Sequence, residues 1–174
     1  NAGSSNTQSS IGALDISGWN TQSATDMNRM FYRTSATSIT GLGDLNTSLV
    51  TNMSQMFNNC PSGVVGQASE TFATKMVSGT LRWDVNNVVN FNNMFQDAEQ
   101  LSNANFPTNW NITSDASKTV SMSTMFGGTP AGLTNITNLD AFATKTISET
   151  WYGGTSYTAW NMSRVSSLSQ FAYA

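Results

Sequence analysis

The sequence contains no histidine and only one cysteine, Cys60. These absences exclude a Cys/His zinc site and an intramolecular disulfide, and they leave the chain without the residue that most often acts as a general base. The three glutamates and seven aspartates are scattered along the chain, whereas a glycosidase needs two carboxyl groups held at a defined separation. We therefore expect a protein that is not an enzyme and that holds no metal ion and no cofactor.

Charged residues are also scarce, at 10% of the chain, and the seven Lys and Arg residues form no cluster. Without a basic stripe to follow a phosphate backbone, we expect no nucleic-acid partner. No apolar run approaches the ~20 residues that a membrane-spanning helix needs, so we expect no membrane insertion. The chain begins at Asn1 rather than at methionine, which suggests a processed form or an excised fragment and favours export.

Neutral polar residues take the place of the missing charges, and many large apolar residues accompany them. Five Trp, nine Phe and nine Met residues indicate that the chain folds around a core despite its abundance of Asn, Ser and Thr. The length of 174 residues fits one domain. We predict a polar N-terminal arm over residues 1–12 and a single repeat domain over residues 13–174.

An internal repeat is the main signal in the sequence. Alignment on the dipeptide Met-Phe gives five copies that share one plan, although the last copy ends in Phe-Ala. The copies are GWNTQSATDMNRMF at 18–31, GDLNTSLVTNMSQMF at 43–57, RWDVNNVVNFNNMF at 82–95, NWNITSDASKTVSMSTMF at 109–126 and AWNMSRVSSLSQFA at 159–172. In four of the five, a large apolar residue stands eight positions before the first residue of the cluster, as Trp19 stands before Met27.

A short helix is predicted at each Met-Phe cluster. The residue before the cluster has a side chain that accepts hydrogen bonds from the free N–H groups of a first helical turn. These predicted helix caps are Asp26, Asn52, Asn90, Ser121 and Ser167. Apolar residues follow at the first, fourth and fifth helical positions, which lie on one face. With the tryptophans they form the predicted repeat core: Trp19, Met27, Met30, Phe31, Met53, Met56, Phe57, Trp83, Phe91, Met94, Phe95, Trp110, Met122, Met125, Phe126, Trp160, Leu168 and Phe171.

The segments upstream of the tryptophans predict one short strand per copy, as in ALDIS at 13–17 and TLRW at 80–83. A coil of one strand and one short helix cannot bury its apolar side alone, so the coils are expected to stack. We therefore predict an α/β solenoid whose coils each contain a short parallel strand and a short helix joined by irregular connectors. The similar segments FATKMVS at 72–78 and FATKTIS at 142–148 suggest a second, longer period.

Aromatic residues and the cysteine leave alternatives open. The tryptophans at the repeat position could stack on sugars, but their equivalence from copy to copy favours packing in the core. Trp151 lies outside the repeat register, and Trp151, Tyr152 and Tyr157 flank glycines, so we regard these three as candidates for contact with a partner. Cys60 is interpreted as a small buried apolar residue, with an intermolecular disulfide as the alternative.

The strings LDISGWNTQSATDMNRMF and LNTSLVTNMSQMFNNC resemble the BspA-like leucine-rich repeat family, the DUF285 surface-protein repeats. Units of that family have the form of a Leu-Asp-Leu-Ser-x-Trp strand, then Asn-Val-Thr-Asn-Met, then Met-Phe. The match covers residues 13–60 well, although Leu45 replaces Trp there, and it is looser over 80–174, where inserts interrupt the pattern and Phe171-Ala172 replaces Met-Phe. The resemblance implies a leucine-rich-repeat-like solenoid of a bacterial or protist surface protein, secreted or anchored to the cell envelope and linked to adhesion.

Two functions follow from these expectations. The first is an extracellular or cell-surface domain for adhesion or molecular recognition, whose partner is a host or matrix protein or a glycan. Low charge and abundant Asn, Ser and Thr suit hydrogen-bonded recognition, and the connectors 58–80 and 127–157 would carry specificity. The second is a structural subunit of an extracellular filament, in which copies of the chain stack head to tail. It rests on the lack of an obvious polar cap at either end of the repeats.

Overall fold

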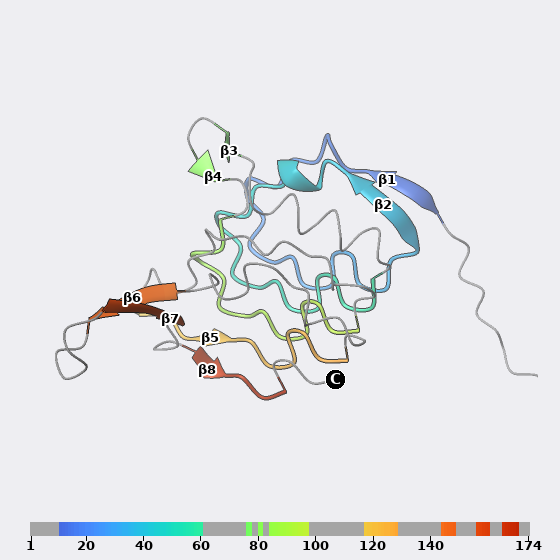
Figure 1. Ribbon diagram of the computed structural model, residues 1–174. Coiled ribbons are helices and arrows are strands. Elements are labelled where there is room, and N and C mark those ends of the chain that lie inside the picture. The colour runs from blue at the N-terminus through green and yellow to red at the C-terminus, as the bar shows by residue number, and fades with distance from the viewer. Residues whose placement is uncertain are drawn as a thin grey trace, which may run out of the picture.

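The structure, a computed structural model, describes residues 11–60, 76–77, 80–81, 84–97, 117–128, 144–148, 156–160 and 165–170. Within these ranges the repeat copies lie side by side, and equivalent segments of successive copies form rows across the stack (Figure 1). Most of the predicted arm 1–12 and of the connectors lies outside the described residues. No helix in the described ranges is long and apolar enough to cross a membrane.

Two pairs of short parallel strands connect the copies. Strand β1 (Gly12–Asp15) pairs with β2 (Ala36–Thr40), and a turn of 3-10 helix, η1 (Leu42–Asp44), follows β2. Later in the chain, β5 (Val120–Ser121) pairs with β8 (Val165–Ser167). Parallel strands need a long crossover connection between them, and the remainder of each copy provides it.

Two antiparallel pairs project away from the stacked turns (Figure 1). Strand β3 (Met76–Val77) pairs with β4 (Thr80–Leu81), and β6 (Thr144–Ser148) pairs with β7 (Ser156–Trp160). The strand expected at 80–83 therefore pairs with a neighbour in sequence rather than with another copy. Strands β3 and β6 lie within the two similar segments 72–78 and 142–148. The longer period in the sequence therefore corresponds to the first strands of these two antiparallel pairs.

A row of parallel pairings crosses the stack at the residue that precedes each Met-Phe cluster. Asp26 pairs with Asn52, Asn52 with Asn90, and Asn90 with Ser121. The pairing of β5 with β8 continues the row to Ser167. These five residues are the predicted helix caps, so the structure places equivalent positions of all five copies next to one another.

A ladder of backbone hydrogen bonds extends from this row through the clusters. In the second copy, the N–H groups of Met53, Gln55 and Phe57 each donate to a carbonyl of the third copy at 2.9 Å. The pairs of the ladder, each given as N–H donor and carbonyl acceptor, are Met27 and Asn52, Arg29 and Ser54, Phe31 and Met56, Met53 and Asn90, Gln55 and Asn92, Phe57 and Met94, Phe91 and Ser121, Asn93 and Ser123, Phe95 and Met125, Met122 and Ser167, and Thr124 and Ser169. Alternate N–H groups of each copy thus bind the copy that follows it.

The clusters are consecutive turns, in contrast to the short helices that the sequence predicts. The N–H groups of Met56 and Asn58 donate to carbonyls three residues earlier, those of Met53 and Gln55, at 3.3 and 3.2 Å. The N–H groups between them bind the next copy, so the i to i−4 bonds of an α-helix do not form. One residue of each cluster has a left-handed backbone: Arg29 (φ 58°), Gln55 (φ 57°), Asn93 (φ 59°), Thr124 (φ 55°) and Gln170 (φ 53°).

The core is a continuous column of side chains inside the stack. The rings of Phe31, Phe57, Phe95 and Phe126 are stacked, with successive centroids 5.4, 5.6 and 5.7 Å apart. The predicted core residues that are buried are Met27, Phe31, Met53, Met56, Phe57, Phe91, Met94, Phe95, Met122, Met125 and Phe126. Residues before the clusters add Ile16, Ala36, Ile39, Leu42, Leu45, Val50, Val85, Val88 and Val120. Each large side chain buried in this way contributes about 1.5–3 kcal/mol.

Three of the predicted core residues are not fully buried. Trp19 is 49% exposed and Leu168 is 40% exposed, while Met30 is only partly buried against the core. Leu45 holds the position of Trp19 in the second copy and is fully buried, so one repeat position has different surroundings in successive copies. Trp83, Trp110 and Phe171 lie outside the described residues, and Trp160 is the last residue of β7.

Candidate binding site

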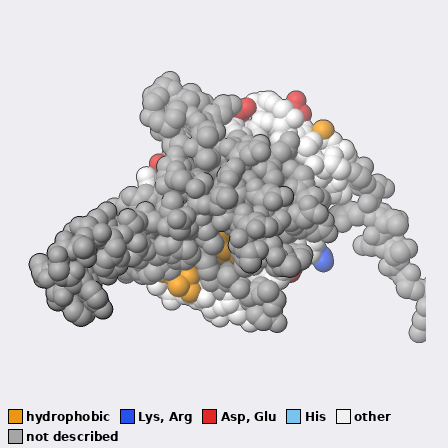
Figure 2. All heavy atoms as spheres, viewed as in Figure 1, with side chains coloured by type: hydrophobic (Ala, Val, Ile, Leu, Met, Phe, Trp, Pro, Cys, Tyr) orange, Lys and Arg blue, Asp and Glu red, His pale blue; other side chains and the backbone are white. Residues whose placement is uncertain are grey.

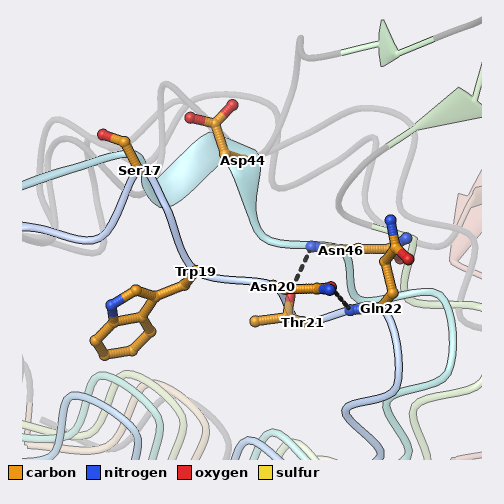
Figure 3. Close-up of a pocket in the computed structure, with 7 residues that line it drawn as sticks. All are labelled: Ser17, Trp19, Asn20, Thr21, Gln22, Asp44 and Asn46. Carbon is orange, nitrogen blue, oxygen red and sulfur yellow. Dashed lines mark hydrogen bonds between the residues drawn. The ribbon is translucent and has the colours of Figure 1, made fainter.

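A polar groove lies where the turns after β1 meet the turns after η1. It has a volume of about 400 Å³ and is lined by Ser17, Trp19, Asn20, Thr21, Gln22, Asp44 and Asn46 (Figure 3). Six of these seven side chains are polar, and the seventh is the exposed tryptophan. The first copy supplies five of the residues and the second copy supplies the other two, so the groove depends on the stacking of both.

One hydrogen bond and one glycine set the spacing of the two walls. The hydroxyl of Thr21 accepts a bond from the N–H of Asn46 at 2.7 Å. Gly41, just before η1, has a left-handed backbone with φ 84°, and a β-carbon there would lie 2.5 Å from the Cα of Ser17. Glycine therefore allows the second copy to approach the first closely beside the groove.

Asn20 and Asn46 hold equivalent places on the two walls, and each closes a turn with its own side chain. The Oδ1 of Asn20 accepts the N–H of Gln22 at 3.1 Å. The Oδ1 of Asn46 accepts the N–H and the hydroxyl of Ser48 at 3.0 and 2.8 Å. These Asx turns fix the side chains and use their oxygens. Among the described residues, neither amide NH2 group has an acceptor.

The indole of Trp19 extends at one end of the groove, away from Gln22 and Asn46 (Figure 3). It is about half exposed, and no described residue accepts a hydrogen bond from its N–H. An indole offers a flat apolar face and a single N–H donor. The groove therefore combines one apolar platform with several hydrogen-bonding side chains, and it is more polar than most small-molecule sites.

The groove carries negative charge and no positive side chain. Asp44 is the one carboxylate among the seven lining residues. Beside the groove, bonds from the hydroxyl and the backbone N–H of Ser17 hold the pKa of Asp15 below its usual value. This carboxyl is therefore ionised at neutral pH. Together the two carboxylates disfavour an anionic ligand.

Four of the five predicted helix caps close turns with their own side chains, as Asn20 and Asn46 do. The Oδ1 atoms of Asp26, Asn52 and Asn90 each accept the N–H two residues ahead, at 2.7, 3.0 and 3.0 Å. The hydroxyl of Ser167 accepts in the same way at 3.4 Å. Ser121 differs, because its hydroxyl donates to an asparagine of the preceding copy at 2.6 Å. The side chains of Asp26, Asn52, Asn90 and Ser167 thus shape the first turn of their clusters, and within the described part of the chain no helix follows any of the five caps.

The groove residues were not singled out as a site by the sequence pattern, although one signal points to them. An Asn or Asp directly follows the large apolar residue in every copy, at Asn20, Asn46, Asp84, Asn111 and Asn161. The three aromatic residues expected to contact a partner are a separate set. Trp151 and Tyr152 lie outside the described residues, and Tyr157 falls within β7, so that contact stays a prediction.

Cys60 lies in the core, away from the groove. It is 1% exposed, and its Sγ donates to the carbonyl of Phe31 at 3.0 Å. Burial raises the pKa of the thiol to about 12, so the group is neutral at physiological pH. A neutral, shielded thiol has little reactivity toward oxidants or a second thiol.

A family model matches most of the chain. The model is described as "Mycoplasma protein of unknown function, DUF285" and matches residues 4–139 and 66–174. The two matches overlap, which is expected where a repeat-based model fits an array in more than one register. No curated protein and no solved structure matches the chain.

Proposed function

The chain belongs to the DUF285 family, and we propose that it is a non-enzymatic extracellular domain that acts in adhesion or molecular recognition at a cell surface. The observation that carries the proposal is the groove, in which an exposed Trp19 stands beside neutral polar side chains. Binding residues commonly lie on turns that a rigid scaffold holds in place. Here the backbone ladder and the buried column are the scaffold, and the groove residues take no part in either.

For the architecture, we propose a leucine-rich-repeat-like solenoid of the BspA-like kind. The parallel register of five copies supports it, because each copy of such an array contacts mainly its neighbours. The single continuous core supports it as well. In this proposal, consecutive turns occupy the part of each coil where the sequence predicts a short helix.

The chemistry of the surface supports a partner that is recognised through hydrogen bonds. Only 10% of residues are charged. Where Figure 2 shows described residues, on the one face that it presents, few side chains are acidic or basic. A surface rich in hydroxyl and amide groups favours contacts made directly or through ordered water. The partners that we propose are therefore a host or matrix protein or a glycan.

The test is a binding assay against immobilised matrix proteins and immobilised glycans. We expect saturable binding to at least one surface, and we expect a Trp19→Ala/Asn46→Asp double variant to bind about tenfold more weakly. Tyr32→Ala removes an exposed aromatic side chain outside the groove and serves as the control, with binding unchanged. The proposal would be contradicted if the folded wild-type chain bound saturably to none of these surfaces.

A second candidate function, a filament subunit, has its own supporting observation. Within the clusters, each copy donates N–H groups to the next, so the cluster of the first copy presents carbonyls outward. Among the described residues, no donor reaches the carbonyls of Asp26, Asn28 and Met30. Likewise, the N–H groups of Leu168 and Gln170 find no acceptor there. A second copy of the chain stacked head to tail would pair these groups and extend the ladder.

Negative-stain electron microscopy with light scattering at several protein concentrations tests this second function. Filaments of uniform width, with a scattering mass that rises with concentration, are the expected result. A mass that stays at 18.7 kDa at every concentration would exclude the filament and leave the recognition function as the proposal.

A further inference from the structure

We infer that the groove between the first two copies binds a neutral saccharide through stacking on Trp19. The inference rests on the proposed recognition function and names its ligand class. It is carried by three independent features of the groove: an exposed indole, a set of amide groups held by turns, and the lack of any positive charge.

The indole supplies the apolar contact that a sugar ring needs. One face of a pyranose ring carries several C–H groups and packs flat on an aromatic ring, whereas the ring edges carry hydroxyls. Trp19 is 49% exposed and stands at the end of the groove rather than inside the core (Figure 3). Its counterpart Leu45 is buried, so core packing does not account for an exposed tryptophan at this position.

The side-chain amides supply matching hydrogen bonds. Sugar hydroxyls both donate and accept, and they pair well with amide groups in fixed positions. The Asx turns hold Asn20 and Asn46 in place through Oδ1 and leave both NH2 groups for a ligand. Gln22 adds a further amide with no partner among the described residues. Because the turns restrain the asparagine side chains before binding, little conformational freedom is lost when a ligand binds.

Charge and size select the kind of saccharide. Asp44 in the groove and the ionised Asp15 beside it disfavour sulfated, phosphorylated or sialylated sugars. The lining contains no lysine or arginine that would pair with such groups. The volume of about 400 Å³ falls within the range of small-molecule sites, at its lower end, and fits a neutral monosaccharide or disaccharide unit of a longer chain.

The experiment uses the purified full chain on an array of neutral and acidic oligosaccharides, with immobilised collagen and laminin in parallel. We expect binding to one or more neutral saccharides and none to their sulfated or sialylated counterparts. In a titration with the bound saccharide, the indole N–H resonance of Trp19, assigned by its absence in Trp19→Phe, should shift in ¹H–¹⁵N NMR spectra.

Three variants test the geometry. Trp19→Ala should weaken saccharide binding by about tenfold, and Trp19→Phe should retain part of the affinity because a ring remains. Asn46→Asp keeps the oxygen that closes the turn and replaces the outward NH2 with an acceptor, so it should weaken binding with no loss of folded structure. Tyr32→Ala should bind like wild type.

The outcomes separate this inference from the proposed function. Binding to collagen or laminin with no binding to any neutral saccharide would overturn the saccharide inference and leave the recognition function standing. Binding to a neutral saccharide that Trp19→Ala does not weaken would overturn the site. Binding to none of the surfaces would overturn both. Circular dichroism of each variant confirms that it is folded.

Discussion

The rings of Phe57 and Phe95 lie with centroids 5.6 Å apart and planes only 4° from parallel, although they belong to different copies. Both side chains are buried, and the ladder bond from the N–H of Phe57 to the carbonyl of Met94 fixes their separation at the backbone. Side-chain stacking and backbone pairing therefore depend on the same register. Disturbing one ring of the column should weaken the contact with both neighbouring copies.

Phe57→Ala should lower the free energy of unfolding by about 3–5 kcal/mol, because it removes a fully buried ring with stacked partners on both sides. Urea denaturation followed by circular dichroism measures the change. Leu49→Ala, at a position that is 51% exposed, is the control and should change stability by no more than about 0.5 kcal/mol. Equal effects at the two positions would contradict the buried column.

Gly41→Ala should destabilise the chain by at least about 1–2 kcal/mol, because a β-carbon there would have a left-handed backbone and would meet the backbone of Ser17. Gly18→Ala is the matched control, since a β-carbon at Gly18 has no atom within 4 Å. Thermal unfolding of both variants gives the comparison. A Gly41→Ala variant as stable as Gly18→Ala would disprove the close approach of the two copies beside the groove.

Thr124→Asn should raise stability by up to about 1 kcal/mol. Thr124 is β-branched and has φ 55°, a conformation that asparagine adopts at lower cost. In a helix the two residues have nearly equal propensity, so the exchange would be neutral there. The same change at Thr119, an exposed residue without positive φ, should bring no gain. Chemical denaturation of the two variants therefore distinguishes turns from a helix at this cluster.

Cys60 should make stability depend on pH in the alkaline range. In the unfolded chain the thiol ionises near 9.0, but in the folded chain its pKa is about 12. Between these values the unfolded state loses its proton first, so the free energy of unfolding falls as pH rises, by at most about 1.4 kcal/mol per pH unit. Below pH 9 this contribution is fully present.

Denaturation of wild type and Cys60→Ala at pH 8, 9.5 and 10.5 checks the expectation. The wild type should lose more stability across this series than the variant, which lacks the thiol. In addition, a thiol reagent at pH 8 should label Cys60 only after unfolding, because the side chain is 1% exposed. Rapid labelling of the folded chain would show that the cysteine is accessible.

The sequence pattern predicted which residues are equivalent, but not the backbone between them. The spacing of Met53, Met56 and Phe57 indicates side chains on one face, and a helix is the usual cause. Consecutive turns give the same spacing, because each also closes over three residues. The feature that distinguishes them is the left-handed Gln55, and glutamine gives no signal for positive φ. Pairing with the next copy imposes that conformation, and such pairing is not visible within one copy.

The groove illustrates a second limit. Repeat alignment assigns Trp19 and Leu45 to one position, and it gives no information on what surrounds that position at a given place in the stack. Leu45 is buried, whereas Trp19 is exposed. The Asn residues that follow them were visible in sequence, but their role depends on the contact between the hydroxyl of Thr21 and the second copy. A site built from two copies cannot be recognised from either copy alone.

The hydrogen bonds that join successive copies span very different lengths of chain. Hydrogen bonds between the first and second copies, the second and third, the third and fourth, and the fourth and fifth include examples that span 26, 38, 31 and 46 residues, respectively. Register is therefore independent of the distance along the chain, because it is set at the clusters and not by the connectors. A lineage that carries such an array can lengthen a connector, or duplicate or delete an entire unit, without misaligning the remainder. Evolution can in this way remodel the exposed face of the protein while its interior stays unchanged.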